Sequence, residues 1–395
     1  MTSEHSVFRD ESKLDINYIP AKLTHREREQ RLLGEFFSFI LQCPLRMTQR
    51  VILIGDVGTG KTALAQTFGA DLTNQAKRKN LKFHYIHINC REFRGSLQSI
   101  IHKIVTVFRP HYPARGYAAD EILTILMQIL DEEETSLIVA LDEFDSLIEK
   151  GGSDAVYKLT RMHETRQGQP QRLSFIFIMR DIAATEQLDD SAKSTLQRNI
   201  IRLERYDKLK LVDILAERAV LAFNVGAVEE EVVDLVAELA HCEPGNARFG
   251  IELLWRAGKY ADASELGHVS AECIRNAISA ILPMLPRSVL VSLGFHEKLF
   301  LLAIARYFKE NEEVYIKISE AERAYEIVCE EYDEPPKSHT QIWLYVQYLS
   351  KIGVLRAEVV SAETRGRANR ISLPSISAVE LEQEMHLRLQ ESGEI

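Results

Sequence analysis

The sequence has few cysteines, no long apolar run and no excess of basic residues, and each shortage excludes a class of protein. Its five cysteines stand far apart and form no CxxC pair, which argues against a disulfide framework or a zinc site and fits a reducing, cytoplasmic setting. The longest apolar runs, such as Leu299–Ala305, fall far short of the roughly 18 residues that a membrane-spanning helix needs. The polar start MTSEHSVFRDESK has no apolar core of the kind found in signal peptides. We therefore expect no membrane contact.

The formal net charge is -10, from 48 basic and 58 acidic residues. This balance excludes a uniformly basic surface that binds nucleic acid, but it is compatible with a local basic patch. A length of 395 residues predicts two or three domains rather than one.

Apolar runs that alternate with helical patterns fill the first half of the chain. Strands are expected at residues 51–55, 83–89, 137–141, 173–179 and 200–203. Helices are expected between them, at 62–73, 96–107, 121–130 and 158–165. This alternation predicts an α/β domain built on a mostly parallel sheet with helices on both faces.

The pattern becomes almost purely helical from about residue 206 to 282. A third unit then shows helices at 296–308, 319–331 and 340–351, a polar segment after the first of them, and extended runs at 354–360 and 370–373. We expect an N-terminal arm at 1–16, an α/β base at 17–205, a helical unit at 206–285 and a C-terminal domain at 286–395.

The segment GDVGTGKT, residues 55–62, matches the phosphate-loop pattern GxxxxGK[ST]. Glycines allow consecutive backbone N–H groups to turn toward phosphate oxygens, and the following helix directs its positive end at the anion. The pattern predicts ATP or ADP with Mg²⁺, in which Lys61 bridges the β- and γ-phosphates and Thr62 binds the metal. The predicted nucleotide-binding residues of this segment and the next position are Gly55, Val57, Gly58, Thr59, Gly60, Lys61, Thr62 and Ala63.

The run LIVALDEFD, residues 137–145, places two acids where a buried strand ends. Ligands gather at the carboxyl ends of strands in open α/β sheets. Asp142 is predicted to hold Mg²⁺ and Glu143 to orient the water that attacks the γ-phosphate, so both join Lys61 as catalytic candidates. Asp145 is open to two interpretations, since it could also cap the next helix.

Two arginines are further candidates for contact with phosphate. Arg180 follows the strand at 173–179, which could end beside the phosphate loop. Arg248 lies in the first turn of a helix that Asn246 could cap, where the helix dipole does not favour a cation, so a role outside the helix is plausible. Arginine is suited to multidentate phosphate contact. The alternative for each is an ordinary surface arginine.

The chain resembles the archaeal origin-recognition replication initiators, which are AAA+ ATPases related to the eukaryotic origin-recognition large subunit and its helicase-loading partner. The resemblance covers nearly the whole chain and includes YIPAKLTHREREQ (18–30), HINCREF (87–93), RYDKLKLVDILAERA (205–219), PGNAR (244–248) and FHEKLFLLAIA (295–305). It implies an AAA+ parallel-sheet base, a helical lid and a C-terminal winged-helix domain.

The resemblance also implies roles for particular residues. Tyr18, Ile19 and Pro20 are expected to line the adenine. Tyr206 and Arg218 match lid positions near the nucleotide, and Arg248 matches the sensor-2 arginine. The stretch after Cys90 stands where the family has a DNA-touching helical insertion, and FRPHYPARGY (108–117), with Arg109 and Arg115, is its most basic part.

Three positions depart from the family pattern. Arg180 stands where the sensor-1 residue is usually Asn, and Val57 replaces a common Pro. The element LDDSAKSTL (188–196) carries Ser191 where the family places an Arg that acts on a neighbour's nucleotide. Lys193 and Arg198 lie nearby but not at the matching position. We therefore expect slow hydrolysis.

In a winged-helix domain one helix enters the major groove and the wing contacts the backbone or minor groove. Residues 340–351 are the candidate groove helix; Trp343, Tyr345 and Tyr348 within it are interpreted as core residues. Residues 351–370 include five basic residues, Arg356 among them, and only two acids. We therefore expect a basic patch that neutralises DNA phosphates. The predicted DNA contacts here are Lys337, Ser338, His339, Thr340, Arg365, Arg367 and Arg370.

The leading hypothesis is an ATP-dependent initiator that binds duplex origin DNA in the nucleoid, helps to recruit the replicative helicase, and assembles with other initiator subunits or as an oligomer on DNA. The alternative is a signalling-type AAA+ switch whose winged helix binds protein instead of DNA. The two hypotheses differ in whether duplex binding falls steeply with salt.

Overall fold

The computed structural model describes residues 6–113, 116–161, 168–196, 199–243, 247–281, 287–311, 313–361, 367–374 and 376–391. The chain forms two compact units. One contains residues 19–210 with 244–247, and the other contains residues 1–18, 211–243 and 248–395. No helix within these described ranges is both long and apolar enough to cross a membrane.

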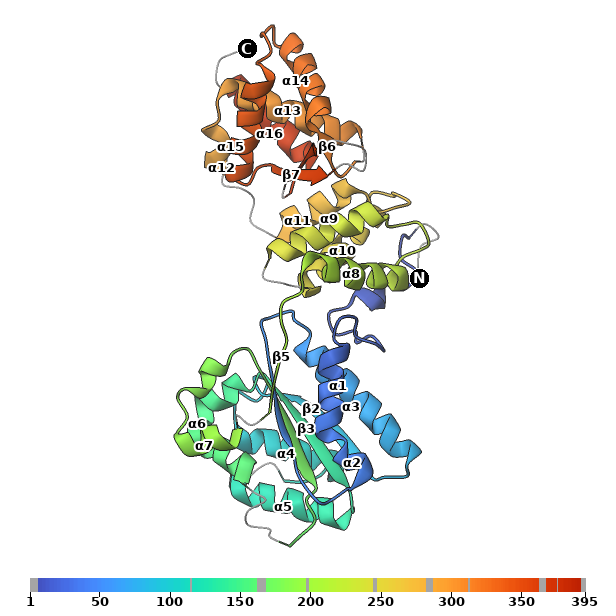
Figure 1. The fold of residues 1–395 in the computed structure, drawn as a ribbon, viewed down its shortest axis with the longest axis vertical. Coiled ribbons are helices and arrows are strands. Elements are labelled where there is room, and N and C mark those ends of the chain that lie inside the picture. The colour runs from blue at the N-terminus through green and yellow to red at the C-terminus, as the bar shows by residue number, and fades with distance from the viewer. Residues whose placement is uncertain are drawn as a thin grey trace. The chain divides into compact units, whose positions relative to one another are not determined.

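The first unit is built on a five-stranded sheet in the order β2-β3-β4-β1-β5 (Figure 1). Its strands are β1 (Arg50–Ile54), β2 (Phe83–Asn89), β3 (Ser136–Asp142), β4 (Leu173–Met179) and β5 (Ile200–Arg202). All of the pairs are parallel, which confirms the predicted sheet. Because β1 lies between β4 and β5, the loop that follows β1 meets the ends of both neighbours.

Successive strand residues point to opposite faces of this sheet, and those on both faces are apolar. Helices therefore cover both faces. On one face, α1 (Glu27–Phe37), α2 (Phe39–Gln42) and α3 (Lys61–Arg78) share a core with Val51 and Leu53 of β1. On the other face, α4 (Leu97–Phe108), α5 (Ala119–Glu132), α6 (Asp145–Arg161) and α7 (Asp190–Leu196) share a core with Ile52 and Ile54.

Helix α6 begins at Asp145, much earlier than the expected helix at 158–165, and residues 162–167 lie outside the described part. The sequence pattern concealed this start because the pair Gly151-Gly152 breaks it. Gly152 has φ 54° and interrupts the helical backbone. With its ψ of -152°, this positive-φ conformation is open essentially to glycine alone, so the helix kinks there and continues.

The lid helices are α8 (Lys208–Ala222), α9 (Glu230–Cys242), α10 (Ala247–Ala263) and α11 (Ala271–Ile281). All but the first residues of α8 and α10 belong to the second unit. The N-terminal arm packs on these helices through a short 3-10 helix, Glu11–Leu14, and the residues before it. Phe8 stacks on Phe223 with ring centroids 4.9 Å apart, and the Trp255 indole donates to Glu11 Oε1 at 2.8 Å. The arm is thus part of the lid's fold.

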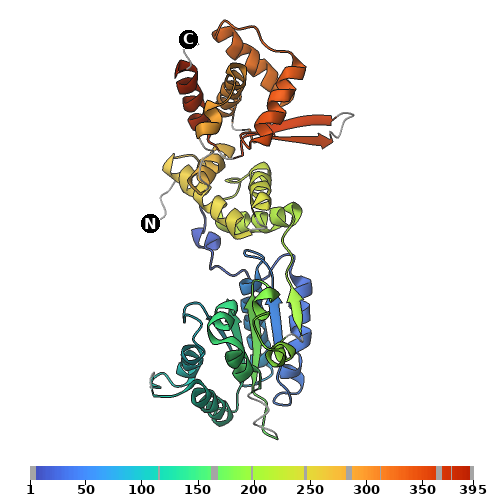
Figure 2. The same ribbon diagram turned by 90° about the vertical axis from the view of Figure 1, so that its left-hand side faces the viewer.

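The C-terminal domain has the winged-helix order. It consists of α12 (Arg287–Val291), α13 (Phe295–Glu310), β6 (Ile316–Lys317), α14 (Ile318–Glu331), α15 (His339–Lys351), β7 (Arg356–Ser361), β8 (Arg367–Ser372) and α16 (Ala378–Glu391). The strands form an antiparallel sheet in the order β6-β8-β7. Figure 2 shows the β7–β8 hairpin projecting from the domain's helices. Strand β6, within the segment expected only to be polar, was missed because it spans just two residues.

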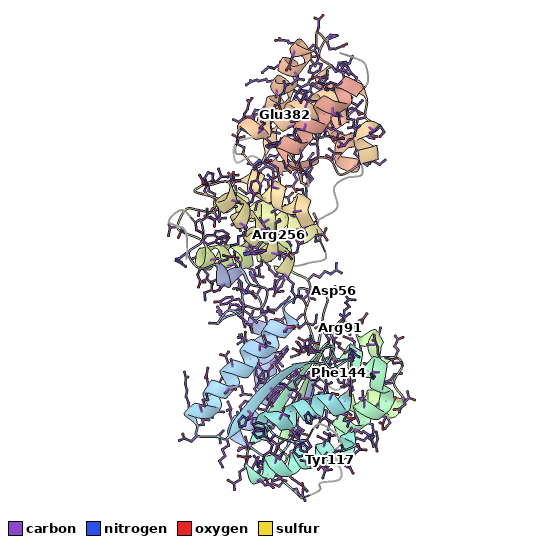
Figure 3. The ribbon with its side chains drawn as sticks, turned by 180° about the vertical axis from the view of Figure 1, so that it is seen from behind. Asp56, Arg91, Tyr117, Phe144, Arg256 and Glu382 are labelled. Carbon is purple, nitrogen blue, oxygen red and sulfur yellow. The ribbon has the colours of Figure 1, made fainter. Side chains whose placement is uncertain are left out.

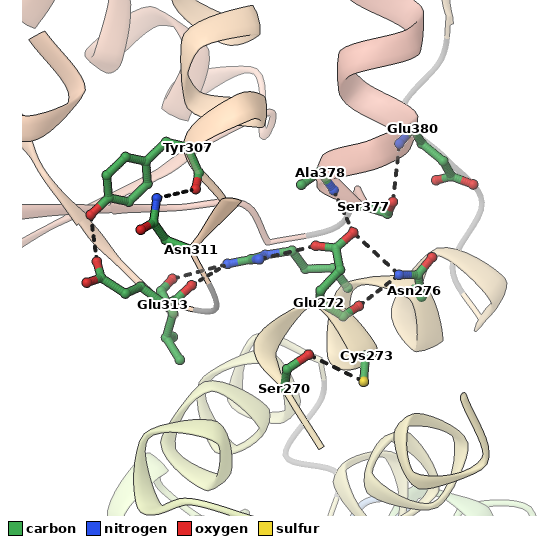
Figure 4. Close-up of polar contacts among 12 residues, drawn as sticks. Ser270, Glu272, Cys273, Asn276, Tyr307, Asn311, Glu313, Ser377, Ala378 and Glu380 are labelled. Atoms are coloured by element: carbon green, nitrogen blue, oxygen red, sulfur yellow. Dashed lines mark hydrogen bonds and ion pairs between the residues drawn. The ribbon is translucent and has the colours of Figure 1, made fainter. Parts of the chain in front are cut away.

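A buried arginine joins the lid to the winged-helix domain. Arg275 of α11 is 1% exposed, and its guanidinium lies 4.3 Å from the centroid of the Phe308 ring of α13. It donates to the backbone oxygen of Glu313 at 3.1 Å and to the Glu272 carboxylate at 3.2 Å. The same carboxylate accepts the Ala378 N–H at 2.9 Å (Figure 4). Burial lowers the Arg275 pKa, and the Glu272 charge opposes this shift.

Replacing Arg275 with Ala should destabilise the lid and winged helix by about 3 kcal/mol, because it removes one partner of a buried ion pair. Both tryptophans, Trp255 and Trp343, lie in this unit, so urea unfolding followed by tryptophan fluorescence measures it. The matched control is Arg256→Ala on α10 (Figure 3), whose side chain is 39% exposed and pairs with Glu252. The control should change stability by less than about 1 kcal/mol. Equal unfolding midpoints for the two variants would contradict a stabilising role for Arg275.

Candidate functional site

The phosphate loop connects β1 to α3 in a conformation that only glycine adopts easily. Gly58 and Gly60 have φ values of 79° and 88°, which side chains disfavour. A Cβ added to Gly55 would come within 2.5 Å of the Leu203 carbonyl oxygen, so no side chain fits there. Thr59 is fully buried, and its hydroxyl donates to the Asp56 carbonyl at 2.9 Å. These glycine conformations and this contact define the shape of the loop.

The Lys61 side chain folds back over this loop. Its Nζ donates to the carbonyl oxygens of Gly55 at 2.6 Å and Asp56 at 2.8 Å. Burial lowers the pKa of Lys61, while the nearby charges of Asp142, Asp145 and Asp56 act in the opposite direction. The Lys61 amine lies in a sheltered loop, where bonds to phosphate oxygens can replace its bonds to backbone carbonyl groups. This position suits contact with a polyphosphate.

Asp142 ends β3 beside the start of α3. Its Oδ2 accepts the Thr62 hydroxyl at 2.6 Å, and the His87 Nε2 lies 3.3 Å from the same oxygen. Burial alone would raise the pKa of Asp142, but the hydrogen bonds from His87 and Thr62 outweigh it, and the net shift is downward. The carboxylate is thus ionised at neutral pH. A hydroxyl and a carboxylate held together are oxygen ligands of the type that Mg²⁺ prefers, so the residues fit this metal.

Glu143 has φ 48°, a left-handed conformation that is costly for a non-glycine residue. Its neighbours hold it there: Asp142 is buried, and Phe144 is fully buried with its ring centroid 4.4 Å from that of Phe177. The Glu143 carboxyl is 45% exposed and lies 3.9 Å from Arg91. Figure 3 shows Arg91 and Asp56 at the same end of the base domain. The strained turn thus leaves one acid accessible between two buried residues.

Asp145 and Arg180 connect the ends of β3 and β4. The Asp145 carboxylate accepts the Arg180 backbone N–H at 3.2 Å, and burial raises the pKa of Asp145. Asp145 therefore does more than begin α6. The Arg180 side chain is exposed, and its charge is one of the factors that lower the Lys61 pKa, after burial. The structure thus brings Arg180 to the same edge of the sheet as Lys61.

The adenine and lid candidates divide between the two units. Tyr206, 5% exposed, belongs with the phosphate loop, and its hydroxyl lies 3.1 Å from where a Cβ of Gly60 would stand. In the other unit, Arg218 donates to the Tyr18 carbonyl at 3.2 Å, and its guanidinium lies 4.7 Å from the centroid of that ring.

The roles expected for the other adenine and lid candidates stay predictions. Arg248 is exposed in the first turn of α10, and Asn246, its predicted cap, lies outside the described residues. Ile19 and Pro20 belong to the base unit. Their roles toward nucleotide, like those of Tyr18, Tyr206 and Arg218, stay predictions.

The candidate DNA contacts of the base are only partly described. Arg109 follows α4 and forms ion pairs with Glu133 at 2.7 Å and Glu132 at 3.2 Å. Arg109 also lines a surface cavity of about 480 Å³. Arg115 lies outside the described residues. The pairing with two acids weakens the local positive charge around Arg109.

The candidate groove helix α15 buries one side and exposes the other. Ile342, Val346 and Leu349 are buried, while Thr340, Gln341, Gln347 and Lys351 are exposed. Lys337, Ser338 and His339 are also exposed at its start, and His339 hydrogen-bonds to Glu322. The exposed face is thus polar and nearly neutral, with Leu344 and Tyr348 as its apolar members.

The wing is described in part. Arg370 of β8 is exposed, and its guanidinium lies 5.6 Å from the centroid of the Tyr315 ring. Arg365 and the side chain of Arg367 lie outside the described part of the structure.

Two expectations about this domain were wrong. Arg356, counted in the basic patch, binds Glu238 of the lid at 2.8 Å and Glu358 at 3.3 Å, so its charge is compensated there. Tyr348, expected in the core, is 41% exposed, because it falls one helical turn after Leu344 on the outer face. Trp343 and Tyr345 pack against the core as expected.

Two residues near the phosphate loop were not predicted as site residues. His87 lies on β2 two residues before the strand ends at Asn89, directly opposite Ala140, and its Nε2 is 3.3 Å from Asp142 Oδ2. Arg26 is 4% exposed and contacts the phosphate loop. The presence of a histidine near the carboxyl end of a buried strand could have suggested His87. Arg26 lay inside the quoted stretch YIPAKLTHREREQ, but nothing in that pattern indicated which groups it binds.

Three protein families match successive parts of this chain. They are an AAA domain over residues 46–188, a Cdc6 AAA+ ATPase-type lid domain over 212–279 and a CDC6 C-terminal winged helix domain over 288–381. The ORC1-type DNA replication protein 2 of Sulfolobus acidocaldarius is 31% identical over 98% of this chain and 96% of that protein. The chain belongs to the ORC1-type DNA replication protein family.

Other family members support this assignment. The ORC1-type DNA replication protein of Thermococcus kodakarensis is 30% identical over 93% of this chain and 88% of that protein. The crystal structure of Cdc6p from Pyrobaculum aerophilum matches 98% of this chain and 100% of that one, with a TM-score of 0.84 and 27% identity. The Aeropyrum pernix ORC1 protein, solved in complex with DNA, matches 99% and 98% with a TM-score of 0.64 and 27% identity. The family resemblance and the predicted AAA+ base, lid and winged helix are thus confirmed, and membership supports ATPase activity.

The nucleotide site predicts opposite behaviour for two variants. Lys61→Ala should weaken ATP binding at least about tenfold, since it removes a charged hydrogen bond to phosphate. Glu143→Ala should keep ATP affinity but lower hydrolysis by about 10²–10⁴-fold. Fluorescent-nucleotide titration and phosphate release measure the two effects. Lys77→Ala, an exposed lysine on the same helix, is the matched control. Unchanged nucleotide affinity in Lys61→Ala would refute the assigned phosphate contact.

Proposed function

We propose that this ORC1-type protein is an ATP-dependent initiator that binds duplex origin DNA and helps to load the replicative helicase. The observation that carries this proposal is the similarity, over 99% of the chain, to an ORC1 protein solved in complex with DNA. The exposed polar face of α15 is consistent with it.

DNA binding is assigned mainly to the winged-helix domain. Helix α15 exposes Thr340, Gln341 and Gln347, whose amides and hydroxyl can bond base edges in the major groove. Lys337 before the helix and Lys351 at its end are exposed cations that can neutralise backbone phosphates on either side. The wing, with Arg365, Arg367 and Arg370, is assigned to the adjacent backbone or minor groove. Arg109 and Arg115 of the base are proposed as a second contact.

The base is proposed to bind ATP or ADP. Backbone N–H groups of residues 55–60 and the start of α3 hold the phosphates, and Lys61 bonds their oxygens. Thr62 and Asp142 would hold Mg²⁺, which supplies charge stabilisation to the transferring phosphoryl group. Glu143 orients the attacking water from its accessible position at the end of β3. The residues Tyr18–Pro20, Tyr206, Arg218 and Arg248 are proposed to enclose the rest of the nucleotide.

Hydrolysis is proposed to be slow and to act as a switch between ATP and ADP states. Ser191 replaces a cation that members of the family use on a neighbour's nucleotide, and its hydroxyl accepts a hydrogen bond from Arg161 at 2.9 Å. A neutral hydroxyl cannot stabilise the charge of a phosphoryl transition state as an arginine does. Association with other initiator subunits, an oligomer on DNA and a helicase partner follow from the family assignment and are part of the proposal.

The wing should account for much of the salt dependence of binding. Replacing Arg365, Arg367 and Arg370 with Ala should weaken duplex binding and flatten the plot of log affinity against log salt, by roughly 0.9 for each DNA phosphate that is no longer neutralised. Fluorescence anisotropy across a salt series measures this slope. The control is Lys309→Ala with Arg388→Ala, which removes two charges that pair with Glu382 and Glu384 of α16. An unchanged slope in the wing variant would exclude these contacts.

The α15 face should determine sequence preference. Gln341→Ala and Gln347→Ala should each reduce discrimination between genomic origin duplex and random duplex by about 1–3 kcal/mol. The salt slope should stay unchanged, because neither residue is charged. Competition binding with the two duplexes measures the effect. If both these variants and the wing variant bind DNA like the unmodified protein, the domain serves protein partners, as in a signalling-type switch.

A further inference from the structure

Arg26 is a buried cation that joins the phosphate loop to the segment leading out of β5. It precedes α1 and is only 4% exposed. Its Nε and Nη2 both donate to the Thr59 carbonyl oxygen, at 3.1 and 2.9 Å. Nη2 also donates to the Glu204 carbonyl oxygen at 2.6 Å. One nitrogen thus connects the loop with the segment after β5.

The remaining faces of the Arg26 guanidinium are also occupied. Its Nη1 donates to the Glu29 carboxylate at 3.2 Å, and its central carbon lies 4.1 Å from the centroid of the Tyr206 ring. A contact over an aromatic ring together with a fork of N–H donors is specific to arginine, and a lysine ammonium cannot reproduce both. A buried charge of this kind is costly unless its donors have acceptors. The surrounding acceptors therefore fix the position of the Arg26 guanidinium.

The bonds to Thr59 set the direction of the next backbone N–H. The Thr59 carbonyl and the Gly60 N–H belong to one planar trans peptide unit and point in opposite directions. By holding the carbonyl, Arg26 turns the Gly60 N–H away from itself. The phosphate loop functions through N–H groups that converge on the anion, and Gly60, with φ 88°, has the backbone freedom to rotate if the carbonyl is released.

The segment after β5, residues 203–206, also touches the loop directly. The Arg205 side chain pairs with Asp56 of the loop at 2.6 Å. The Tyr206 hydroxyl lies 3.1 Å from the position of a Gly60 Cβ. The chain continues from this segment into α8, which begins at Lys208. The phosphate loop is thus in direct contact with the segment that leads to α8.

We propose that Arg26 is a positioning residue of the nucleotide site, which orients the Gly60 N–H for phosphate and couples occupancy of the loop to residues 203–206. This inference rests on the proposed nucleotide binding, and it adds a residue and a coupling to it. Arg26 itself need not touch the nucleotide, because it acts through the Thr59 and Glu204 carbonyl groups.

Arg26→Lys and Arg26→Gln test this proposal, with Arg28→Gln as the matched control, since Arg28 lies two residues away and is exposed. The affinity for fluorescent ATP and ADP analogues is measured well below the melting temperature of each variant. Both Arg26 variants should bind these nucleotides about 10–100-fold more weakly, as expected for a misdirected hydrogen bond to a charged group. Arg28→Gln should bind like the unmodified protein. If Arg26→Gln does not fold, Arg26→Lys, which keeps the charge, still gives the comparison.

The coupling has its own readout, which a purely structural role would not change. Nucleotide should slow amide hydrogen exchange in residues 203–207 of the unmodified protein, and this protection should be lost in Arg26→Lys at saturating nucleotide. Unchanged affinity in the Arg26 variants, or full protection retained in Arg26→Lys, would overturn the proposal. Absence of nucleotide binding in the unmodified protein would instead refute the proposed function.

Discussion

The position of β1 between β4 and β5 in a parallel sheet is the constraint on which the rest of the candidate nucleotide site depends. Parallel pairing brings the carboxyl ends of neighbouring strands to one edge. The phosphate loop therefore meets Asp142 from β3 and the segment 203–206 after β5. The Arg180 backbone after β4 bonds to Asp145, which follows β3. Groups that are far apart in the chain become neighbours through strand order alone.

Arginines that bind backbone carbonyl groups connect the parts of each compact unit. Arg275 joins the lid to the winged helix through the Glu313 carbonyl and the Phe308 ring. Arg26 joins the phosphate loop to the end of β5 through the carbonyl groups of Thr59 and Glu204. A guanidinium suits this task because its donors diverge in one plane while its face stacks on an aromatic ring. Such contacts are specific, because a displaced donor would leave a buried polar group unpaired.

The sequence predicted much of the fold and the centre of the site, for identifiable reasons. Buried parallel strands appear in the sequence as apolar runs, so all five strands of the base were predicted. The start of α6 and the strand β6 were missed, because a glycine pair interrupts the first and the second has only two residues. The glycine loop from Gly55 to Thr62 and the place of Asp142 at the end of a buried strand were predictable because such motifs have fixed residue types at fixed spacing. The roles of these residues toward nucleotide and metal stay predictions. Helical spacing could not reveal that Tyr348 faces outward, nor that the charge of Arg356 is compensated by Glu238 of the lid.

By itself the sequence determined the order of the domains, the phosphate-loop motif and the family, because local patterns and short motifs carry that information. Only the tertiary structure decided that Thr62 and His87 meet on Asp142, that Glu143 is held in a strained turn, and that Arg26 bridges two backbone carbonyl groups. The physical reason is the same in each case. A side chain's partners depend on strand register and on which backbone groups face it, and these are set only when distant segments pack together.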